Sequence, residues 1–266
     1  MPKIEVNGFE LYYETYGEGF PIVFIMGLSA NSDWWQSDFI EAFSKKFQVI
    51  VLDNRGAGRS SDPGEDYTMQ TLADDVIGLL NALAIQKAHV LGISMGGMIA
   101  QEVVLNYPER VEKLVLCSTN AGISKSVPPE MEVLKILMAD TSLKTDEENT
   151  RESIPLLFTP DFIENHPEYI ETTVQQILKA PITPNSYKRQ LMAVMQFNAG
   201  KRLKSVHTPT LVVHGKKDIL IPAENGEILA KLIPGAKLVL FEEDAHFLTA
   251  QQPEQVSTTI LDFLAE

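Results

Sequence analysis

Short apolar runs alternate with amphipathic stretches along most of this 266-residue chain. Runs of the kind that forms buried strands occupy residues 21–26, 48–52, 89–91, 113–118, 209–214 and 236–241. Helices are predicted near residues 34–46, 68–83, 98–105, 224–232 and 252–264. At the start, the turn dipeptide Asn7-Gly8 separates residues 3–6 from 9–16 and predicts a hairpin. This order predicts an α/β fold: a mostly parallel sheet with helices on both faces and an antiparallel hairpin at its beginning.

The alternation breaks between residues 123 and 203. This interval holds helix-period segments at 131–138 and 187–197, and prolines at 128, 129, 155, 160, 181 and 184 break the chain between helical segments. A disordered linker is the alternative, but the many Ile, Leu, Met and Phe residues argue against it. We therefore expect a helical cap at 123–203, inserted between core segments 1–122 and 204–266. It should lie over the C-terminal ends of the strands, where α/β sheets bind ligands.

The candidate nucleophile is Ser94, in the sequence GISMGG at residues 92–97. Short Gly/Ser strings also occur in ordinary turns. Here, however, an apolar strand precedes the motif and an apolar helix follows it, which is the context of a nucleophile elbow. In that geometry, unpaired backbone N–H groups at the helix start face the space beside the serine oxygen and stabilise an oxyanion there.

A serine nucleophile needs a base, and the base needs an acid that orients it. Asp218 follows the strand that ends at His214, and His246 follows the strand at 236–241. Both therefore fall in loops beyond strand ends, as Ser94 does. Asp244 is a competing acid, although loop geometry favours Asp218. His214 itself is interpreted as a structural hydrogen-bonding residue.

With these residues, the chain resembles the α/β-hydrolase family, in its capped esterase/lipase-like branch. The resemblance rests on the motif at 92–97, on DNRGAGRS at 53–60 and on PTLVVHGKKD at 209–218. It implies an eight-stranded type of sheet with the cap after the sixth strand. It also implies that Ser94 is the nucleophile, His246 the general base and acid, and Asp218 the orienting carboxylate.

The resemblance further implies an oxyanion hole formed by the backbone N–H groups of Leu28 and Met95. Two departures from the family pattern stand near these groups. Met26 precedes Gly27 where many relatives have histidine, which leaves open how that loop is held. Ala245 stands where a glycine often precedes the catalytic histidine, which puts the local turn in doubt but not the role of His246.

The expected substrate pocket is apolar. Candidate lining residues are Met26, Trp34, Trp35, Met138, Phe158, Met195 and Phe247, with core packing as the alternative for the two tryptophans. Further apolar cap residues are Met131, Leu134, Leu137, Leu156, Leu157, Met192 and Phe197. These residues predict a flexible apolar acyl or alcohol pocket.

The primary hypothesis is a carboxylesterase-type serine hydrolase that cleaves esters of small to medium apolar acids through an acyl-enzyme on Ser94. A lactonase (including an enol-lactonase), a C–C bond hydrolase and a perhydrolase could use the same residues. An anionic substrate would require cations, for which Lys188 and Arg189 are candidates unless they lie on a solvated helix face. A serine at this position argues against the dehalogenase and epoxide-hydrolase branches. The alternative from another class is a non-enzymatic ligand sensor on the same fold.

Composition and charge limit the expected partners and cellular location. The net charge of −14 argues against nucleic acid or an anionic membrane as a partner. The single cysteine, Cys117, rules out an internal disulfide framework. With no apolar signal-peptide core at the N-terminus, we expect a cytoplasmic protein. The expected partner is a small-molecule ester or related acyl substrate, and no metal or organic cofactor is implied. Monomer and homodimer both remain open.

Overall fold

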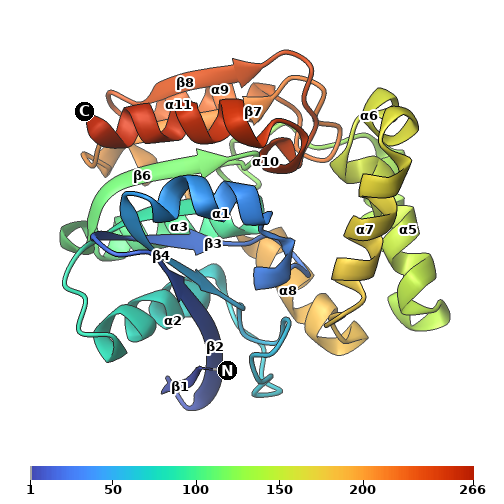
Figure 1. The fold of residues 1–266 in the computed structure, drawn as a ribbon, viewed down its shortest axis with the longest axis horizontal. Coiled ribbons are helices and arrows are strands. Elements are labelled where there is room, and N and C mark those ends of the chain that lie inside the picture. The colour runs from blue at the N-terminus through green and yellow to red at the C-terminus, as the bar shows by residue number, and fades with distance from the viewer. Residues whose placement is uncertain (1) are drawn as a thin grey trace.

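The computed structural model describes residues 2–266, and its centre is an eight-stranded sheet (Figure 1). The strand order across the sheet is β1-β2-β4-β3-β5-β6-β7-β8. The first two strands pair antiparallel, β2 also pairs antiparallel with β4, and the remaining neighbours are parallel. The strands are β1 Lys3–Val6, β2 Phe9–Tyr16, β3 Phe20–Ile25, β4 Phe47–Leu52, β5 Ala88–Ile93, β6 Val111–Cys117, β7 Thr210–Gly215 and β8 Lys237–Phe241.

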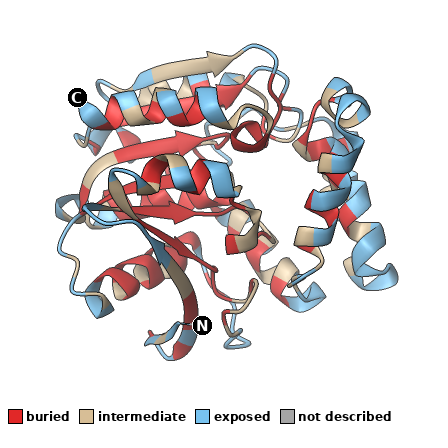
Figure 2. Cartoon of the chain, in the orientation of Figure 1, coloured by how far each residue is buried: buried red, intermediate tan, exposed pale blue. Residues whose placement is uncertain are grey.

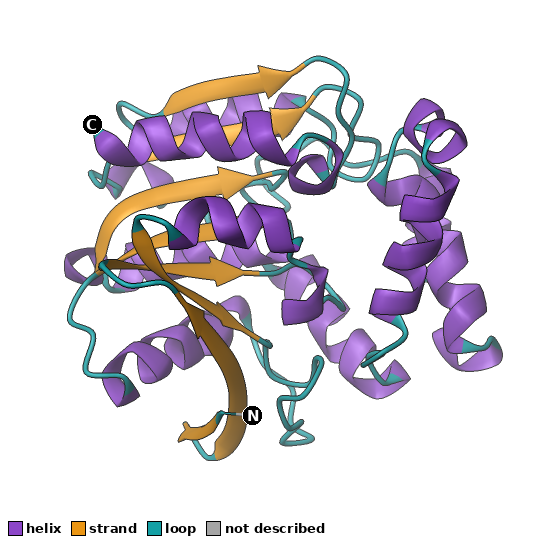
Figure 3. Ribbon diagram, in the orientation of Figure 1, coloured by secondary structure: helices purple, strands orange, loops and turns teal. Residues whose placement is uncertain are grey.

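Helices cover both faces of this sheet, as Figure 3 shows. One apolar cluster joins the sheet to α2 (Met69–Ala82), α3 (Met95–Asn106) and α9 (Glu224–Leu232). A second cluster joins the opposite face to α1 (Ser37–Ser44), α10 (Leu248–Gln251) and α11 (Pro253–Ala265). Adjacent residues of β3 divide between them: Val23 belongs to the first cluster and Phe24 to the second, because side chains alternate across a strand. The central strands are therefore buried on both faces (Figure 2).

The α/β-hydrolase-type fold predicted from the sequence is thus confirmed, including the initial hairpin, in which Val6 pairs with Phe9 across Asn7 and Gly8. The parallel strands all run toward the same edge of the sheet (Figure 3). The loops that follow β3, β4, β5, β7 and β8 consequently meet at that edge. Ser94, Asp218 and His246 lie in three of these loops.

Five α-helices lie between β6 and β7, beyond the C-terminal ends of the strands (Figure 1). We refer to them as the inserted helices. They are α4 Met131–Leu137, α5 Asp146–Leu157, α6 Pro160–Asn165, α7 Pro167–Ile177 and α8 Pro184–Gln196. Where the chain leaves the core and returns to it, Gly122 and Asn198 form an antiparallel bridge.

Prolines act differently in this segment from what the sequence indicates. Pro160, Pro167 and Pro184 begin helices, where a missing backbone N–H removes no intrahelical bond. The prediction that Pro155 interrupts a helix is wrong, because Pro155 lies inside α5. It is exposed, so its ring faces solvent, and because it has no backbone N–H the helix lacks one intrahelical bond, the one to the Arg151 carbonyl.

A buried histidine makes the stability of the core depend on pH. The ring of His89 on β5 packs 4.8 Å from that of Phe20 and 5.5 Å from that of Phe47, between ring centroids. Burial, with a contribution from the charge of Lys113, lowers the pKa of His89 to about 4. The unfolded chain therefore binds a proton between about pH 6.5 and pH 4 that the folded chain does not bind.

We expect the free energy of unfolding to fall as pH decreases from 6.5 to 4, with His89 contributing up to about 3 kcal/mol of the loss. His89→Phe keeps an aromatic ring but removes the titration, so its stability should fall less steeply over this range. Urea unfolding at a series of pH values measures the difference. The same substitution at exposed His207 is the control, and an unchanged slope for His89→Phe would contradict this role for His89.

Candidate active site

Ser94 occupies a sharp turn between β5 and α3. Its backbone adopts φ 58° and ψ −122°, a region that is unfavourable for a residue with a side chain. Two hydrogen bonds hold it there: its N–H donates to the Cys117 carbonyl (2.9 Å), and its carbonyl accepts from the Thr119 hydroxyl (2.7 Å). The turn is possible only because its neighbours are small. A Cβ on Gly96 would lie 2.0 Å from the Ile25 carbonyl oxygen.

Asp218 and His246 form a buried hydrogen-bonded pair. Nδ1 of His246 lies 2.7 Å from Oδ2 of Asp218, and both side chains are almost fully buried. The other carboxylate oxygen, Oδ1, accepts hydrogen bonds from the N–H groups of Leu220 (2.9 Å) and Ile221 (2.8 Å). The carboxylate is therefore held from both sides, and it fixes the orientation of the imidazole.

The charge state of Asp218 follows from its neighbours. Burial favours the neutral acid, but the charge of His246 and hydrogen bonds from His214 and His246 outweigh it and hold the pKa of Asp218 below its usual range. His214 is fully buried, and its Nε2 lies 2.8 Å from the Ile221 carbonyl oxygen and 3.4 Å from Oδ2 of Asp218. His214 is thus a structural hydrogen-bonding residue, as predicted, and it also touches the acid.

Asp244 does not compete for His246. Its Oδ1 accepts a hydrogen bond from the Gln252 amide at 3.0 Å, and no hydrogen bond joins it to the imidazole within residues 2–266. Burial raises the pKa of Asp244, whereas that of Asp218 is lowered. The anionic partner of the imidazole is therefore Asp218.

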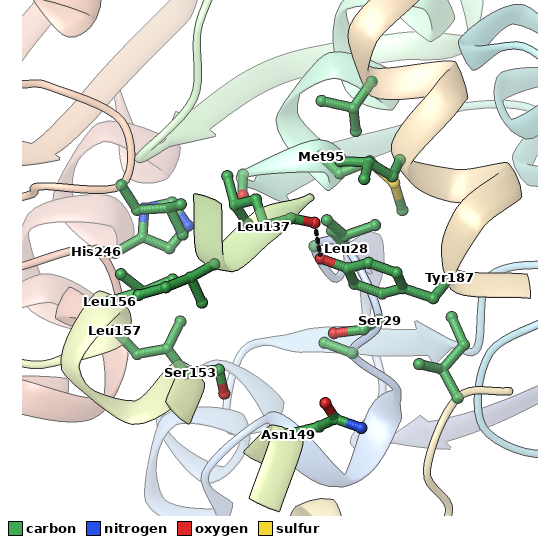
Figure 4. A pocket seen from close by; sticks show the side chains of 18 of the residues that line it. Leu28, Ser29, Met95, Leu137, Asn149, Ser153, Leu156, Leu157, Tyr187 and His246 are labelled. Atoms are coloured by element: carbon green, nitrogen blue, oxygen red, sulfur yellow. Dashed lines mark hydrogen bonds between the residues drawn. The ribbon is translucent and has the colours of Figure 1, made fainter. Parts of the chain in front are cut away.

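Ser94 and His246 open onto the same cavity of about 330 Å³, which lies between the core loops and the inserted helices. Figure 4 shows side chains converging on it from both sides, with Leu28, Met95 and His246 from the core and Leu137, Leu156 and Tyr187 from the inserted helices. Most of the lining is apolar. Apart from His246, its ionisable acid and base residues are the acids Asp146 and Glu152, with no lysine or arginine among the lining residues.

The backbone beside Ser94 offers two free donors. A Cβ on Gly27 would lie 3.0 Å from Cβ and 3.4 Å from Oγ of Ser94, so the loop after β3 touches the serine. The next residue is Leu28. Within residues 2–266, neither the Leu28 N–H nor the Met95 N–H has a hydrogen-bond partner. Both groups are therefore available to a negatively charged oxygen formed at Ser94.

Most predicted pocket residues line this cavity, but several do not. Met26, Trp34, Met138, Met195 and Phe247 line it, together with Leu134, Leu137, Leu156 and Leu157. The expectation for Trp35 and Phe158 is wrong. Trp35 stacks on Phe39 in the core, and Phe158 packs against Phe162 and behind Phe247.

Three other apolar residues from the inserted segment also lie away from the cavity. Met131 and Met192 are exposed, and Phe197 is part of the core. Helical periodicity placed these three residues on apolar faces, but it could not tell a face toward the cavity from one toward the core or toward solvent. The two candidate cations for an anionic substrate also lie outside the cavity lining. Lys188 is exposed, and Arg189 pairs with Asp62 at 2.7 Å.

Sequence reasoning missed the residues that hold the loop after β3. Asn54 donates to the Met26 carbonyl (3.0 Å), and Gln190 of α8 accepts from the Ser29 N–H (2.8 Å). Asp53 accepts from the Ser32 N–H at 2.6 Å and so also braces the loop. Gln190 had a detectable signal, because it shares a helix stripe with the apolar residues 193 and 197 and so puts an amide on a buried face.

Membrane-spanning helices and clusters of metal ligands are both absent from residues 2–266. No helix in this range has the length and apolar character required to cross a bilayer. No group of three or more His, Cys, Asp or Glu side chains in this range is arranged to hold a metal ion.

Comparison with known proteins agrees with this geometry. Residues 21–253 match the family model described as alpha/beta hydrolase fold. A putative carbamate hydrolase RutD from Azorhizobium caulinodans is 31% identical, with 100% of this chain and 99% of the relative covered. The crystal structure of an enol-lactonase from Burkholderia xenovorans LB400 superposes with a TM-score of 0.87 at 28% identity, covering 100% of both chains.

A thermophilic esterase from Thermogutta terrifontis superposes with a TM-score of 0.85 at 30% identity, covering 100% of this chain and 98% of the esterase. These relatives share a fold and carry the names of hydrolases with different substrates. The family model covers most of the chain, and the Azorhizobium relative matches it over its whole length. This chain is therefore a hydrolase that belongs to the alpha/beta hydrolase fold family.

Proposed function

We propose that this hydrolase cleaves neutral carboxylic esters through an acyl-enzyme on Ser94. The observation that carries the proposal is the convergence on one apolar cavity of a strained serine, a histidine oriented by a buried carboxylate, and two unpaired backbone N–H groups. Residues 123–203 act as the cap that closes this cavity. The esterase and enol-lactonase among the similar structures support ester chemistry on this fold.

In this mechanism, the Ser94 hydroxyl attacks the ester carbonyl while the imidazole of His246 takes its proton. The negative charge that develops on the carbonyl oxygen is stabilised by the N–H groups of Leu28 and Met95. His246 then protonates the leaving alcohol, which departs and leaves an acyl-enzyme. A water molecule activated by His246 attacks that acyl group and frees Ser94. Asp218 stays ionised throughout and stabilises the imidazolium.

The charges around the cavity favour a neutral substrate. Its ionisable lining includes Asp146 and Glu152, and no lysine or arginine belongs to it. A carbamate anion, or a lactone with a free carboxylate, would therefore enter without a cationic partner. The apolar lining and the volume of about 330 Å³ suit the acyl chain of a small to medium ester.

A neutral lactone is the second candidate substrate, because a lactone is an internal ester and the enol-lactonase superposes over its whole length. The same serine, histidine and backbone donors would open the ring. Release of the alcohol distinguishes the two substrates. An ester loses its alcohol at acylation, whereas a lactone keeps it attached to the acyl group.

The first test uses p-nitrophenyl esters from acetate to dodecanoate with the wild-type protein and Ser94→Ala. We expect a maximum at one chain length in the wild type and a fall in kcat/KM of at least about 10⁴-fold in Ser94→Ala. Equal rates in the two proteins would refute the nucleophile. Inactivity of the wild type on esters and neutral lactones alike would favour a ligand sensor.

A second test separates the two acids near His246. Asp218→Asn keeps an oxygen for the Leu220 and Ile221 N–H groups but holds the imidazole in the wrong tautomer, so kcat should fall about 10⁴-fold. Asp244→Asn is the matched control, because Asp244 bonds to Gln252 instead. Steady-state kinetics with melting temperatures distinguish a loss of chemistry from a loss of folding. A larger loss in Asp244→Asn would reverse the assignment.

A third test uses two methionines of α8 with nearly equal exposure, Met195 (44%) and Met192 (45%). Only Met195 lines the cavity. Met195→Ala should favour longer acyl chains, with the ratio of kcat/KM for long and short esters rising about tenfold. Met192→Ala should leave that ratio within twofold of wild type. The same ratio in both variants would show that α8 does not form the acyl pocket.

A further inference from the structure

Helix α8 connects the cavity to the loop that carries the Leu28 N–H. Its fully buried residue Gln190 accepts a hydrogen bond from the Ser29 N–H at 2.8 Å, and its amide donates to the Arg55 carbonyl at 3.3 Å. One helix turn earlier, Ser186 donates to the carboxylate of Asp62. One face of α8 is therefore anchored on the core loops that follow β3 and β4.

The adjoining face of the same helix lines the cavity, through Tyr187, Leu191, Val194 and Met195. Residues spaced by three and four positions are neighbours on a helix, so Gln190 lies directly beside the cavity-lining residues Tyr187 and Val194. A ligand that presses on this cavity-lining face pushes against the helix that holds Ser29.

The turn that Gln190 contacts is of an uncommon kind for its sequence. The Ala30 N–H bonds to the Gly27 carbonyl at 3.3 Å, which makes residues 27–30 a β-turn. Ser29 has φ 66°, whereas Leu28 has a negative φ. Positive φ at the third position alone defines a type II turn, and that position strongly prefers glycine. A serine there needs an additional interaction to stay in place.

We infer that Gln190 is a positioning residue of the oxyanion hole: it selects the type II form of the turn 27–30 and so places the Leu28 N–H beside Ser94. The inference rests on the proposed function. Without the carboxamide oxygen, the peptide between Leu28 and Ser29 can rotate into the type I form that a serine prefers. That rotation reverses the Leu28 carbonyl and releases the Ser29 N–H from α8, so Leu28, whose own N–H belongs to the preceding peptide, is no longer held in place beside Ser94. Contacts in the cap thereby control the chemistry of the core.

The test uses Gln190→Met, which keeps the length of the side chain but has no acceptor for the Ser29 N–H. The readout is the rate at which a fluorophosphonate labels Ser94, followed by intact-protein mass, because phosphonylation also develops negative charge on an oxygen in the oxyanion hole. We expect labelling about tenfold slower than in the wild type, the effect of one buried hydrogen bond. Lys188→Met, on the exposed side of α8, should label at the wild-type rate.

Steady-state kinetics on an ester that the wild type hydrolyses provide the second readout. The structure predicts a kcat reduced about tenfold with KM within twofold, because the donor acts on the transition state more than on bound substrate. A general loosening of the cap would instead raise KM.

Ser29→Gly provides the decisive variant, since glycine adopts the positive φ of this turn without help. In the Ser29→Gly background, Gln190→Met should cost at most about threefold in labelling rate instead of about tenfold. This recovery supports the turn as the point of action. An equal loss in both backgrounds, or wild-type labelling of Gln190→Met, would overturn the inference while the proposed function stands. No labelling of the wild type would overturn the proposed function and this role together.

Discussion

The close approach of bare backbone around Ser94 is the constraint on which the site depends. A Cβ on Gly96 would lie 2.0 Å from the Ile25 carbonyl, and one on Gly92 would lie 2.2 Å from the Gly96 carbonyl. With no side chains in between, α3 starts directly against the ends of β3 and β5. Ser94 is thereby forced into its strained conformation and pressed against Gly27. The proposed nucleophile and the loop that holds one of the proposed oxyanion donors are thus positioned by a single packing contact.

Buried carboxylates organise the loops around that contact. Asp218 accepts from two backbone N–H groups and from His246, and Asp53 accepts from the N–H groups of Ser32 (2.6 Å) and Arg59 (2.7 Å). Asp75 receives two hydrogen bonds from the guanidinium of Arg55. A buried charge is costly unless it is paired, so each carboxylate fixes the loop that supplies its donors. These buried acids therefore stabilise the loops, and Asp218 also takes part in the proposed chemistry.

The inserted helices shape the cavity and contact the loop beside Ser94. They supply most of the apolar cavity wall, and through Gln190 they reach the turn beside Ser94. The core by itself would present the serine and histidine to solvent. The cavity lining includes two acids and no lysine or arginine, which is the basis for proposing a neutral substrate. The relatives share this fold, yet their names state different substrates.

The primary structure was sufficient to predict the core. Apolar runs and helical periods are local properties, so the order of strands and helices, the initial hairpin and the position of the inserted segment could be read from them. The same holds for the candidate site of Ser94, Asp218 and His246, because parallel strands bring their C-terminal ends to one edge whatever surrounds them.

The cavity wall could be read in this way only in part. Trp35 and Phe158 are as apolar as Trp34 and Phe247, yet they pack elsewhere, and Met192 differs from Met195 only in the direction it faces. The contact between Gln190 and Ser29 joins residues 161 positions apart. Periodicity marks which residues of a helix share a face, but the neighbour of that face is set by long-range packing, which appears only when the chain is folded.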